Sequence, residues 1–271
     1  MGIRRTLWQL RRRLLGPKRV VTGEDVGLLM RSDELSPHAR RRIRVLHARE
    51  LMLGVPSRAR LPVAGGLVEL GGGDDFPVDW KAFVEIFGLR EYAAEYRDAH
   101  VLDVGAHKGY FGAFALACGA AVVVSFEPAT RNYSALERAA RPARPRWLTG
   151  HAAVGATAGT ATLHLDETAW AHSLREVERP AGEEHVRVVT LEQALAELPT
   201  GGARTIVKID AEGSECDILA RPGPLARVDV LMVEWHQEVA PCSRAELTRA
   251  ITATGLSACP ESTGPLRFAR S

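Results

Sequence analysis

Residues 101–113, VLDVGAHKGYFGA, decide the fold of this chain. The apolar segment 101–104 leads into a turn of small residues at 105–109, and a helix-competent segment follows at 111–118. A strand, a glycine turn and a helix in this order are typical of α/β proteins that bind a charged small molecule. Glycine lets the backbone approach the ligand, and the helix N-terminus offers unpaired N–H groups. The sequence therefore predicts a ligand site at this turn.

An acidic residue follows the glycine turn at a spacing that suits a nucleoside. The segment 122–126, VVVSF, predicts a buried parallel strand and is followed at once by Glu127 and Pro128. An acid at the end of the second strand, about 20 residues after a glycine turn, is placed to bind two ribose hydroxyls. Glu127 could instead cap the helix that starts near Thr130. The ribose interpretation is favoured because turn and acid occur together.

The composition of the turn separates two classes of nucleoside cofactor. Dinucleotide-binding turns carry G-x-G-x-x-G, in which the middle glycine leaves room for a pyrophosphate, whereas this turn reads GAHKG over 105–109. The Asp103 carboxylate would repel a pyrophosphate but could accept hydrogen bonds from the ammonium group of a methionine-like ligand. S-adenosylmethionine is therefore the better match. The phosphate-loop pattern G-x-x-x-x-G-K-[ST] does not occur in the sequence.

Six motifs resemble one enzyme family in their order and spacing. The family is that of the FkbM-type methyltransferases, which are class I, S-adenosylmethionine-dependent enzymes, and the similar segments are DVGAHKGYF, FEPATRNYSALE, AHSL, VVTLEQAL, IVKIDAEGSECDIL and VLMVEWH. The resemblance covers about 83–236, and FEP with KID-x-EG is its most specific part. The family usually carries asparagine where this chain has His107. The residues expected to bind the cofactor are Asp103, Gly105, Ala106, His107, Gly109, Tyr110, Phe111, Glu127, Pro128, Ala153 and Asp210.

Length and composition agree with one large α/β domain and an N-terminal extension. The chain has 271 residues, of which 46% are hydrophobic and 25% charged, as in ordinary globular proteins. The family resemblance implies a Rossmann-like class I methyltransferase sheet of seven strands, mostly parallel with the last strand antiparallel, and helices on both faces. The expected division is a helical extension with a short hairpin at 1–75 and the methyltransferase domain at 76–271.

The order of the elements predicts a parallel sheet. Strands are expected at 101–104, 122–126, 146–148, 186–189, 205–209 and 228–233, helices at 110–118, 131–140 and 243–254, and weak closing strands at 256–258 and 266–269. The segment 67–70 predicts a hairpin before the main domain, and 80–95 predicts one helix. The polar segment 171–184 interrupts the alternation and predicts a long loop.

Charge and cysteine content indicate which partners and which cellular compartment to expect. The net charge is only +2, so nucleic acid is not expected as a partner. The four cysteines form no C-x-x-C pair, Cys118 and Cys216 are expected to be buried small hydrophobes, and the expected compartment is a reducing cytoplasm. The sequence has no apolar run of the ~18 residues that a membrane span needs. The basic segment 1–19 predicts a helix that either is amphipathic and lies on a membrane surface or an acidic partner, or is simply solvated. Residues 40–44 form a second basic cluster.

Polar residues at the ends of the later strands supply candidate catalytic groups. Methyl transfer to a hydroxyl needs a group that removes a proton, and the candidates are His236, Asp210 and Glu234. His236 has a suitable unperturbed pKa, near ~6.5, but could equally make only local hydrogen bonds. Lys208, if buried, needs a carboxylate such as Asp210 or Glu234. The same groups together with Glu212 could hold Mg²⁺, although the metal-free interpretation is favoured and no metal ligand is assigned.

These motifs predict an S-adenosylmethionine-dependent methyltransferase. The resemblance implies an O-methyltransferase that acts on a hydroxyl of a small molecule, a sugar or a secondary-metabolite intermediate. One alternative is a non-catalytic binding protein that keeps the methyltransferase fold, for which His107 would be the visible damage to the turn. Methyltransferases acting on a carboxyl group, an amine or a nucleic acid are further alternatives. The expected partner is the small-molecule acceptor, and a homo-oligomer stays open.

Overall fold

The computed structural model describes residues 20–53, 58–72, 75–167, 171–177, 180–221, 223–260 and 264–270. The amphipathic helix expected within 1–19 lies outside these residues. Among the described residues, no helix combines the length and the apolar character that a membrane crossing requires.

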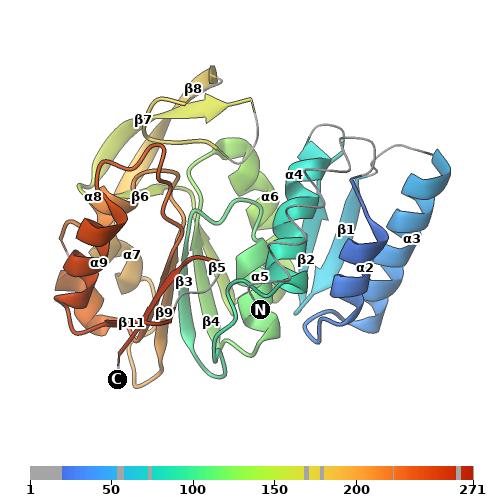
Figure 1. The fold of residues 1–271 in the computed structure, drawn as a ribbon, viewed down its shortest axis with the longest axis horizontal. Helices are drawn as coiled ribbons and strands as arrows, with labels where there is room; N and C mark the ends of the chain where they lie inside the picture. The colour runs from blue at the N-terminus through green and yellow to red at the C-terminus, as the bar shows by residue number, and fades with distance from the viewer. Residues whose placement is uncertain are drawn as a thin grey trace.

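A twisted sheet of seven strands forms the centre of the molecule, in the order β11-β12-β10-β9-β3-β4-β5 (Figure 1). The strands are β3 (His100–Val104), β4 (Val122–Phe126), β5 (Trp147–Gly150), β9 (Thr205–Ile209), β10 (Val230–Val233), β11 (Ser257–Ala258) and β12 (Leu266–Ala269). The strands from β10 to β5 pair in parallel, and β12 is antiparallel to both of its neighbours. This arrangement confirms the predicted class I methyltransferase sheet with an antiparallel last strand.

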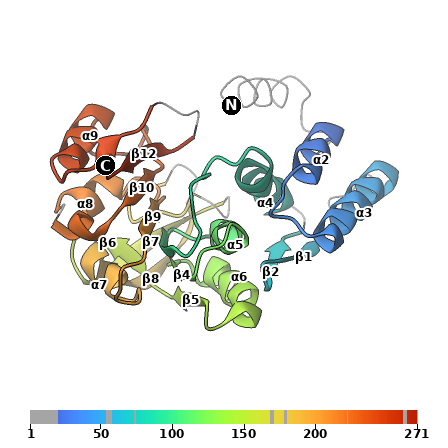
Figure 2. The same cartoon turned by 90° about the horizontal axis from the view of Figure 1, so that it is seen from below.

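Helices cover both faces of the sheet (Figure 2). One face carries α4 (Asp75–Phe83), a π-helical turn (Val84–Gly88), α5 (Tyr110–Ala117) and α6 (Thr130–Ala140), and the other carries α7 (Leu191–Ala196), α8 (Glu215–Leu219) and α9 (Arg244–Thr252). Alternate residues of each strand serve the two faces, as expected for a strand buried on both sides. On β3, for example, Val101 belongs to the first buried cluster and Leu102 to the second.

The N-terminal extension consists of two helices and a hairpin: α2 (Gly23–Met30), α3 (Pro37–Leu53), β1 (Ala59–Val63) and β2 (Gly66–Leu70). Pro37 stands in the first turn of α3, and the Ser36 hydroxyl accepts the backbone N–H of Ala39. Strands β1 and β2 pair antiparallel, which confirms the hairpin. Buried residues of the extension join the same apolar cluster as α4 and α5. The division of the chain at residue 75 stays a prediction.

Two sequence-based expectations about secondary structure are wrong. The helix expected over 80–95 ends at Gly88, and Arg90 takes a left-handed conformation with φ of 56°. The last part of the long loop expected at 171–184, residues 180–184, is strand, because β8 (Pro180–Thr190) pairs antiparallel with β7 (Gly159–Asp166) and parallel with β6 (Ala153–Gly155). In this three-stranded sheet of β6, β8 and β7, backbone hydrogen bonds stabilise the first part of β8, whose exposed side chains show no apolar alternation. Two 3-10 turns, Arg141–Ala143 and Gly223–Arg227, complete the elements.

One cysteine prediction is also wrong. Cys216, at the start of α8, forms a disulfide with Cys242, which precedes α9, with the two Cα atoms 6.0 Å apart. The sequence separation of 26 residues gave no signal for this pair, which arises because α8 and α9 pack together. Cys118 is a partly buried free thiol, and burial together with the neighbouring Glu34 raises its pKa to about 12.

Candidate functional site

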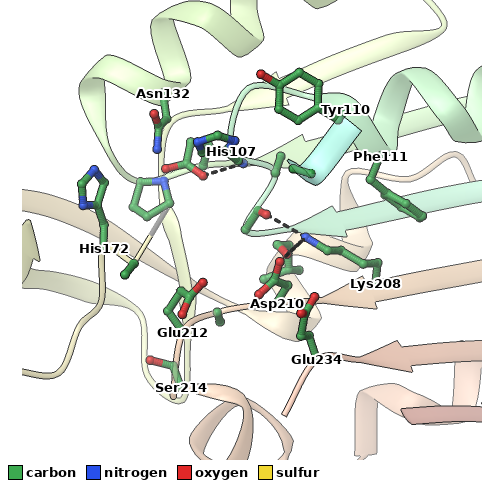
Figure 3. Close-up of a pocket in the computed structure, with 18 of the residues that line it drawn as sticks. His107, Tyr110, Phe111, Asn132, His172, Lys208, Asp210, Glu212, Ser214 and Glu234 are labelled. Carbon is green, nitrogen blue, oxygen red and sulfur yellow. Dashed lines mark hydrogen bonds and ion pairs between the residues drawn. The ribbon is translucent and has the colours of Figure 1, made fainter. Parts of the chain in front are cut away.

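A cavity of about 490 Å³ lies at the carboxyl ends of the parallel strands, where open α/β sheets bind their ligands (Figure 3). It is walled by the turn after β3, the end of β4, the start of β6, the loop after β9 and the end of β10. The predicted site residues in its lining are Gly105, Ala106, His107, Tyr110, Phe111, Glu127, Pro128, Ala153, Asp210, Glu234 and His236.

The turn after β3 depends on glycine at its first position. Gly105 has a φ of 70°, and a Cβ atom placed there would lie 1.7 Å from the backbone oxygen of Asp210. The β3 and β9 loops therefore touch through backbone alone. His107 also takes a left-handed conformation, with φ of 51°. Asparagine and histidine tolerate that region better than most residues, which explains how histidine replaces the usual asparagine without breaking the turn.

Glu127 links the turn to the next strand. One carboxylate oxygen accepts the N–H of His107 at 2.8 Å, and the other accepts the N–H of Ala129 at 3.0 Å, at the start of α6. Burial raises the pKa of Glu127 to about 8 despite these two hydrogen bonds, which lower it. The geometry is compatible with both interpretations of Glu127, the helix cap and the ribose ligand, because its carboxylate bonds to the start of α6 and also faces the cavity.

Two predicted cofactor residues do not line the cavity. Asp103 is fully buried beneath it, where it accepts a hydrogen bond from Ser125 and lies 3.6 Å from the ammonium of Lys208. Gly109 faces the interior, since a Cβ atom there would come within 2.9 Å of Trp147 and Leu136. The turn places these residues against the protein core, and their assignment to the cofactor stays a prediction.

Lys208 is the buried cation at the centre of the site. Its ammonium group donates to the carbonyl of Gly105 at 2.8 Å and lies 3.1 Å from the Asp210 carboxylate, as Figure 3 shows. Burial alone would lower the pKa of Lys208, but Asp210 and Asp103 raise it above its ordinary value. The predicted need for a carboxylate partner is confirmed for Asp210, with Asp103 as the second.

His236 lies among three carboxylates. Its Nδ1 is 3.0 Å from Glu215, and its Nε2 is 3.4 Å from Glu212 and 3.7 Å from Asp210. Burial would lower the pKa of His236, but the hydrogen bond to Glu215 and the nearby carboxylates raise it to about 10. The imidazole is therefore a cation at neutral pH in this arrangement, and not the neutral ring that the ordinary pKa predicted.

Glu234 and Glu212 are acids held in a more protonated state than usual. Burial and the Asp210 charge raise the pKa of Glu234, while the hydrogen bond from the Tyr92 hydroxyl, 2.5 Å away, lowers it. Burial and Asp210 raise the pKa of Glu212 to about 8. The ligand atoms of Asp210, Glu212 and His236 lie within 4.8 Å of one another, which is the spacing of a metal triad.

Several residues of the site were not among the predicted ones. Tyr92 reaches the cavity from the segment after the π-helical turn, and Glu215 is fully buried at the start of α8. The loop residue His172 lines the cavity, and its neighbour Ser173 donates a hydrogen bond to the backbone oxygen of Glu212. His172 and Ser173 belong to the AHSL motif of the family resemblance. No local pattern marks Glu215, because its role depends on His236, which is distant in the sequence.

Known proteins that are similar to this chain are methyltransferases. The family model described as "Methyltransferase FkbM domain" matches residues 103–247. No curated protein sequence matches the chain. Among solved structures, methyltransferase FkbM from Methylobacillus flagellatus KT is 16% identical with a TM-score of 0.43, over 74% of this chain and 56% of that chain. Magnesium protoporphyrin IX methyltransferase from Synechocystis PCC 6803 is 12% identical with a TM-score of 0.43, over 74% and 87%.

The fold and the family match define an S-adenosylmethionine-dependent methyltransferase. The chain belongs to the FkbM methyltransferase family.

Proposed function

We propose that the protein transfers a methyl group from S-adenosylmethionine to a hydroxyl of a small molecule, a sugar or a secondary-metabolite intermediate. The observation that carries this proposal is the group of proton-accepting carboxylates that faces the cavity, with Glu234 foremost. A hydroxyl acceptor needs such a base, whereas a carboxylate acceptor needs none and would be repelled. A volume of about 490 Å³ is typical of small-molecule sites.

The cofactor is assigned to the side of the cavity formed by the turn, Glu127 and Asp210. S-adenosylmethionine supplies a methyl group on a positively charged sulfur. Glu127 uses one lone pair of each oxygen for backbone N–H groups, so each oxygen can still accept a ribose hydroxyl. The Oδ1 atom of Asp210 is buried and accepts no hydrogen bond, which suits it to a cationic ligand group.

Glu234 is the residue that we assign as the base. Its raised pKa brings the carboxylate closer to the working pH and strengthens it as a proton acceptor. Tyr92 fixes its orientation through the hydrogen bond. Asp210 is the second candidate, but its other oxygen is committed to Lys208. His236, protonated at neutral pH, is assigned to hold the carboxylates in place as a cation.

The Mg²⁺ alternative would use Asp210, Glu212 and His236 as ligands. The metal-free interpretation is favoured because His236, itself a cation in this arrangement, forms ion pairs with both carboxylates and so occupies the place of a metal ion. We expect a chelator to leave the rate of methyl transfer unchanged. Loss of activity on chelation, with recovery on adding Mg²⁺, would instead assign the triad as a metal site.

The test of the proposed function has two parts. Calorimetric titration should show binding of S-adenosylmethionine and not of NAD. Release of S-adenosylhomocysteine is then measured with hydroxylated small molecules, carboxylates, amines and RNA as acceptors. Turnover with hydroxylated compounds, lost in Glu234→Gln, supports the proposal. Turnover confined to carboxylates, amines or RNA refutes the acceptor class, and absence of cofactor binding supports the non-catalytic alternative.

A further inference from the structure

The outer face of α3 combines positive charge with exposed apolar side chains. Arg41, Arg44 and Arg49 are exposed, and none has an ion-pair partner among the described residues. On the same helix Val45 is 52% exposed and Met52 is 74% exposed. We call this surface, made of Arg41, Arg44, Val45, Arg49 and Met52, the α3 face.

The α3 face borders a groove of about 370 Å³ between α3 and β1. The charged side chains in the groove are all basic, and they include Arg42, Arg58 and Arg60 as well as Arg41 and Arg49. Within the part of the chain that the structure describes, Arg58 and Arg60 are the only arginines of the groove with an ion-pair partner, because both pair with Glu69. A surface with this excess of positive charge attracts an anionic partner.

The helix keeps its two faces separate. Ala39, Ile43 and Leu46 recur at helical spacing and are buried against the core, so the folded chain already satisfies the inner face. The spacing of 45 and 52, one heptad apart, sets Val45 and Met52 on one exposed stripe between arginines. Burial within the protein does not account for these two side chains.

The kind of anion follows from the apolar residues. Proteins that bind single-stranded nucleic acid stack bases on aromatic side chains, and neither α3 nor β1 contains Phe, Tyr or Trp, the ring of His38 being the one that lines the groove. Basic side chains around exposed aliphatic ones are instead the pattern of surfaces that lie at the headgroup boundary of a bilayer. The segment 1–19 in the sequence continues this character, with seven Lys or Arg residues and no Asp or Glu.

We propose that the α3 face binds the surface of an anionic lipid bilayer. The arginines contact lipid phosphates, and Val45 and Met52 enter the headgroup boundary. In Figure 1, α3 lies at the edge of the molecule remote from β7 and β8, so this surface is separate from the cavity. The inference stands independently of the acceptor proposed above.

The test measures sedimentation of the full chain with vesicles. The protein should bind vesicles of phosphatidylcholine and phosphatidylglycerol in equal parts, bind pure phosphatidylcholine far less, and dissociate as salt is raised. Each arginine near an anionic surface contributes about fivefold to binding. The combined change Arg41→Glu, Arg44→Glu and Arg49→Glu should therefore weaken binding by at least about a hundredfold.

Two further variants separate the α3 face from other causes. The matched control reverses three exposed arginines on other surfaces, Arg187, Arg221 and Arg227, to Glu and should bind vesicles like the unmodified protein, apart from a small effect of net charge. Replacing both Val45 and Met52 by serine should weaken vesicle binding severalfold without changing the salt dependence. Circular dichroism and thermal melting verify that each variant is folded.

Three results would overturn the proposal. The first is unchanged vesicle binding by the folded arginine variant, and the second is equal binding to phosphatidylcholine alone. The third is binding to an RNA oligonucleotide without binding to anionic vesicles, which would make the partner a nucleic acid. An effect of the serine variant on vesicles, with none on RNA, supports the bilayer as the partner.

Discussion

The pKa of His236 depends most directly on Glu215, and replacing Glu215 by Gln tests this dependence. The Glu215 side chain is fully buried, lies 3.0 Å from the Nδ1 of His236 and also accepts the backbone N–H groups of Ala211 and Gly213. Glutamine keeps a carbonyl oxygen for these N–H groups but removes the negative charge. An opposite charge in contact shifts a pKa by about 1–3 units, so the His236 pKa should fall by that amount in Glu215→Gln.

The shift has a consequence for stability. The His236 pKa rises from 6.5 to about 10, and a difference of roughly 3.5 units corresponds to about 5 kcal/mol shared among all its partners. Because the folded pKa is raised, this stabilisation is fully present below pH 6.5 and is lost as pH rises towards 10. The raised pKa of Glu212 adds a loss between its ordinary value of 4.5 and about 8. In Glu215→Gln the decline above pH 8 should be smaller.

Two measurements check this prediction. NMR titration of the imidazole signals reports the pKa of His236 directly, and urea unfolding at a series of pH values reports the slope of stability. Glu192→Gln, an exposed acid in the first turn of α7, is the matched control and should change neither. A His236 that titrates near 6.5 in the unmodified protein, or at the same pH in Glu215→Gln, would refute the reasoning.

Three other substitutions test the site from different directions. Gly105→Ala should abolish cofactor binding in calorimetry and lower the melting temperature, because the new Cβ would lie 1.7 Å from a backbone oxygen. Lys108→Met should cost about 3–5 kcal/mol in urea unfolding, since it leaves Asp79, which accepts from Lys108 at 2.8 Å, as an unpaired buried charge. Glu234→Gln should lower kcat by about 10²–10⁴-fold while cofactor affinity changes little, and an equal loss in both would remove the base assignment.

The parts of the fold that could be predicted are those determined by residues close together in the sequence. The glycine turn after β3, the buried strand β4 and the acid that follows it are contiguous in sequence, and the structure places Gly105 and Glu127 around one cavity. The strand β8 was predicted only in part, because its first residues owe their conformation to pairing with β7. Pairing partners across a sheet are not encoded in the polarity of one segment.

The electrostatic state of the site lay beyond sequence reasoning for a related reason. The spacing of strand ends indicated that Asp210, Glu234 and His236 would meet at one edge, and they do. It gave no indication of Glu215 or Tyr92, whose contacts decide which of these groups carries a proton. A pKa depends on the distance and burial of every neighbouring charge, and these are properties of the folded chain.

The charge of the cavity explains why a cationic cofactor suits this site. Asp210, Glu212 and Glu234 face one cavity, and with Asp103 and Glu215 beside them the negative groups outnumber the cations Lys208 and His236. This excess and burial raise the pKa values of Glu212 and Glu234, and the Glu212 pKa of about 8 favours its protonated form at neutral pH. A positive ligand against these carboxylates favours their ionised forms and should release protons. Under the proposed assignment of Glu234 as the base, binding of the cofactor would therefore favour the ionised form of Glu234, which is the form that can accept the acceptor's proton.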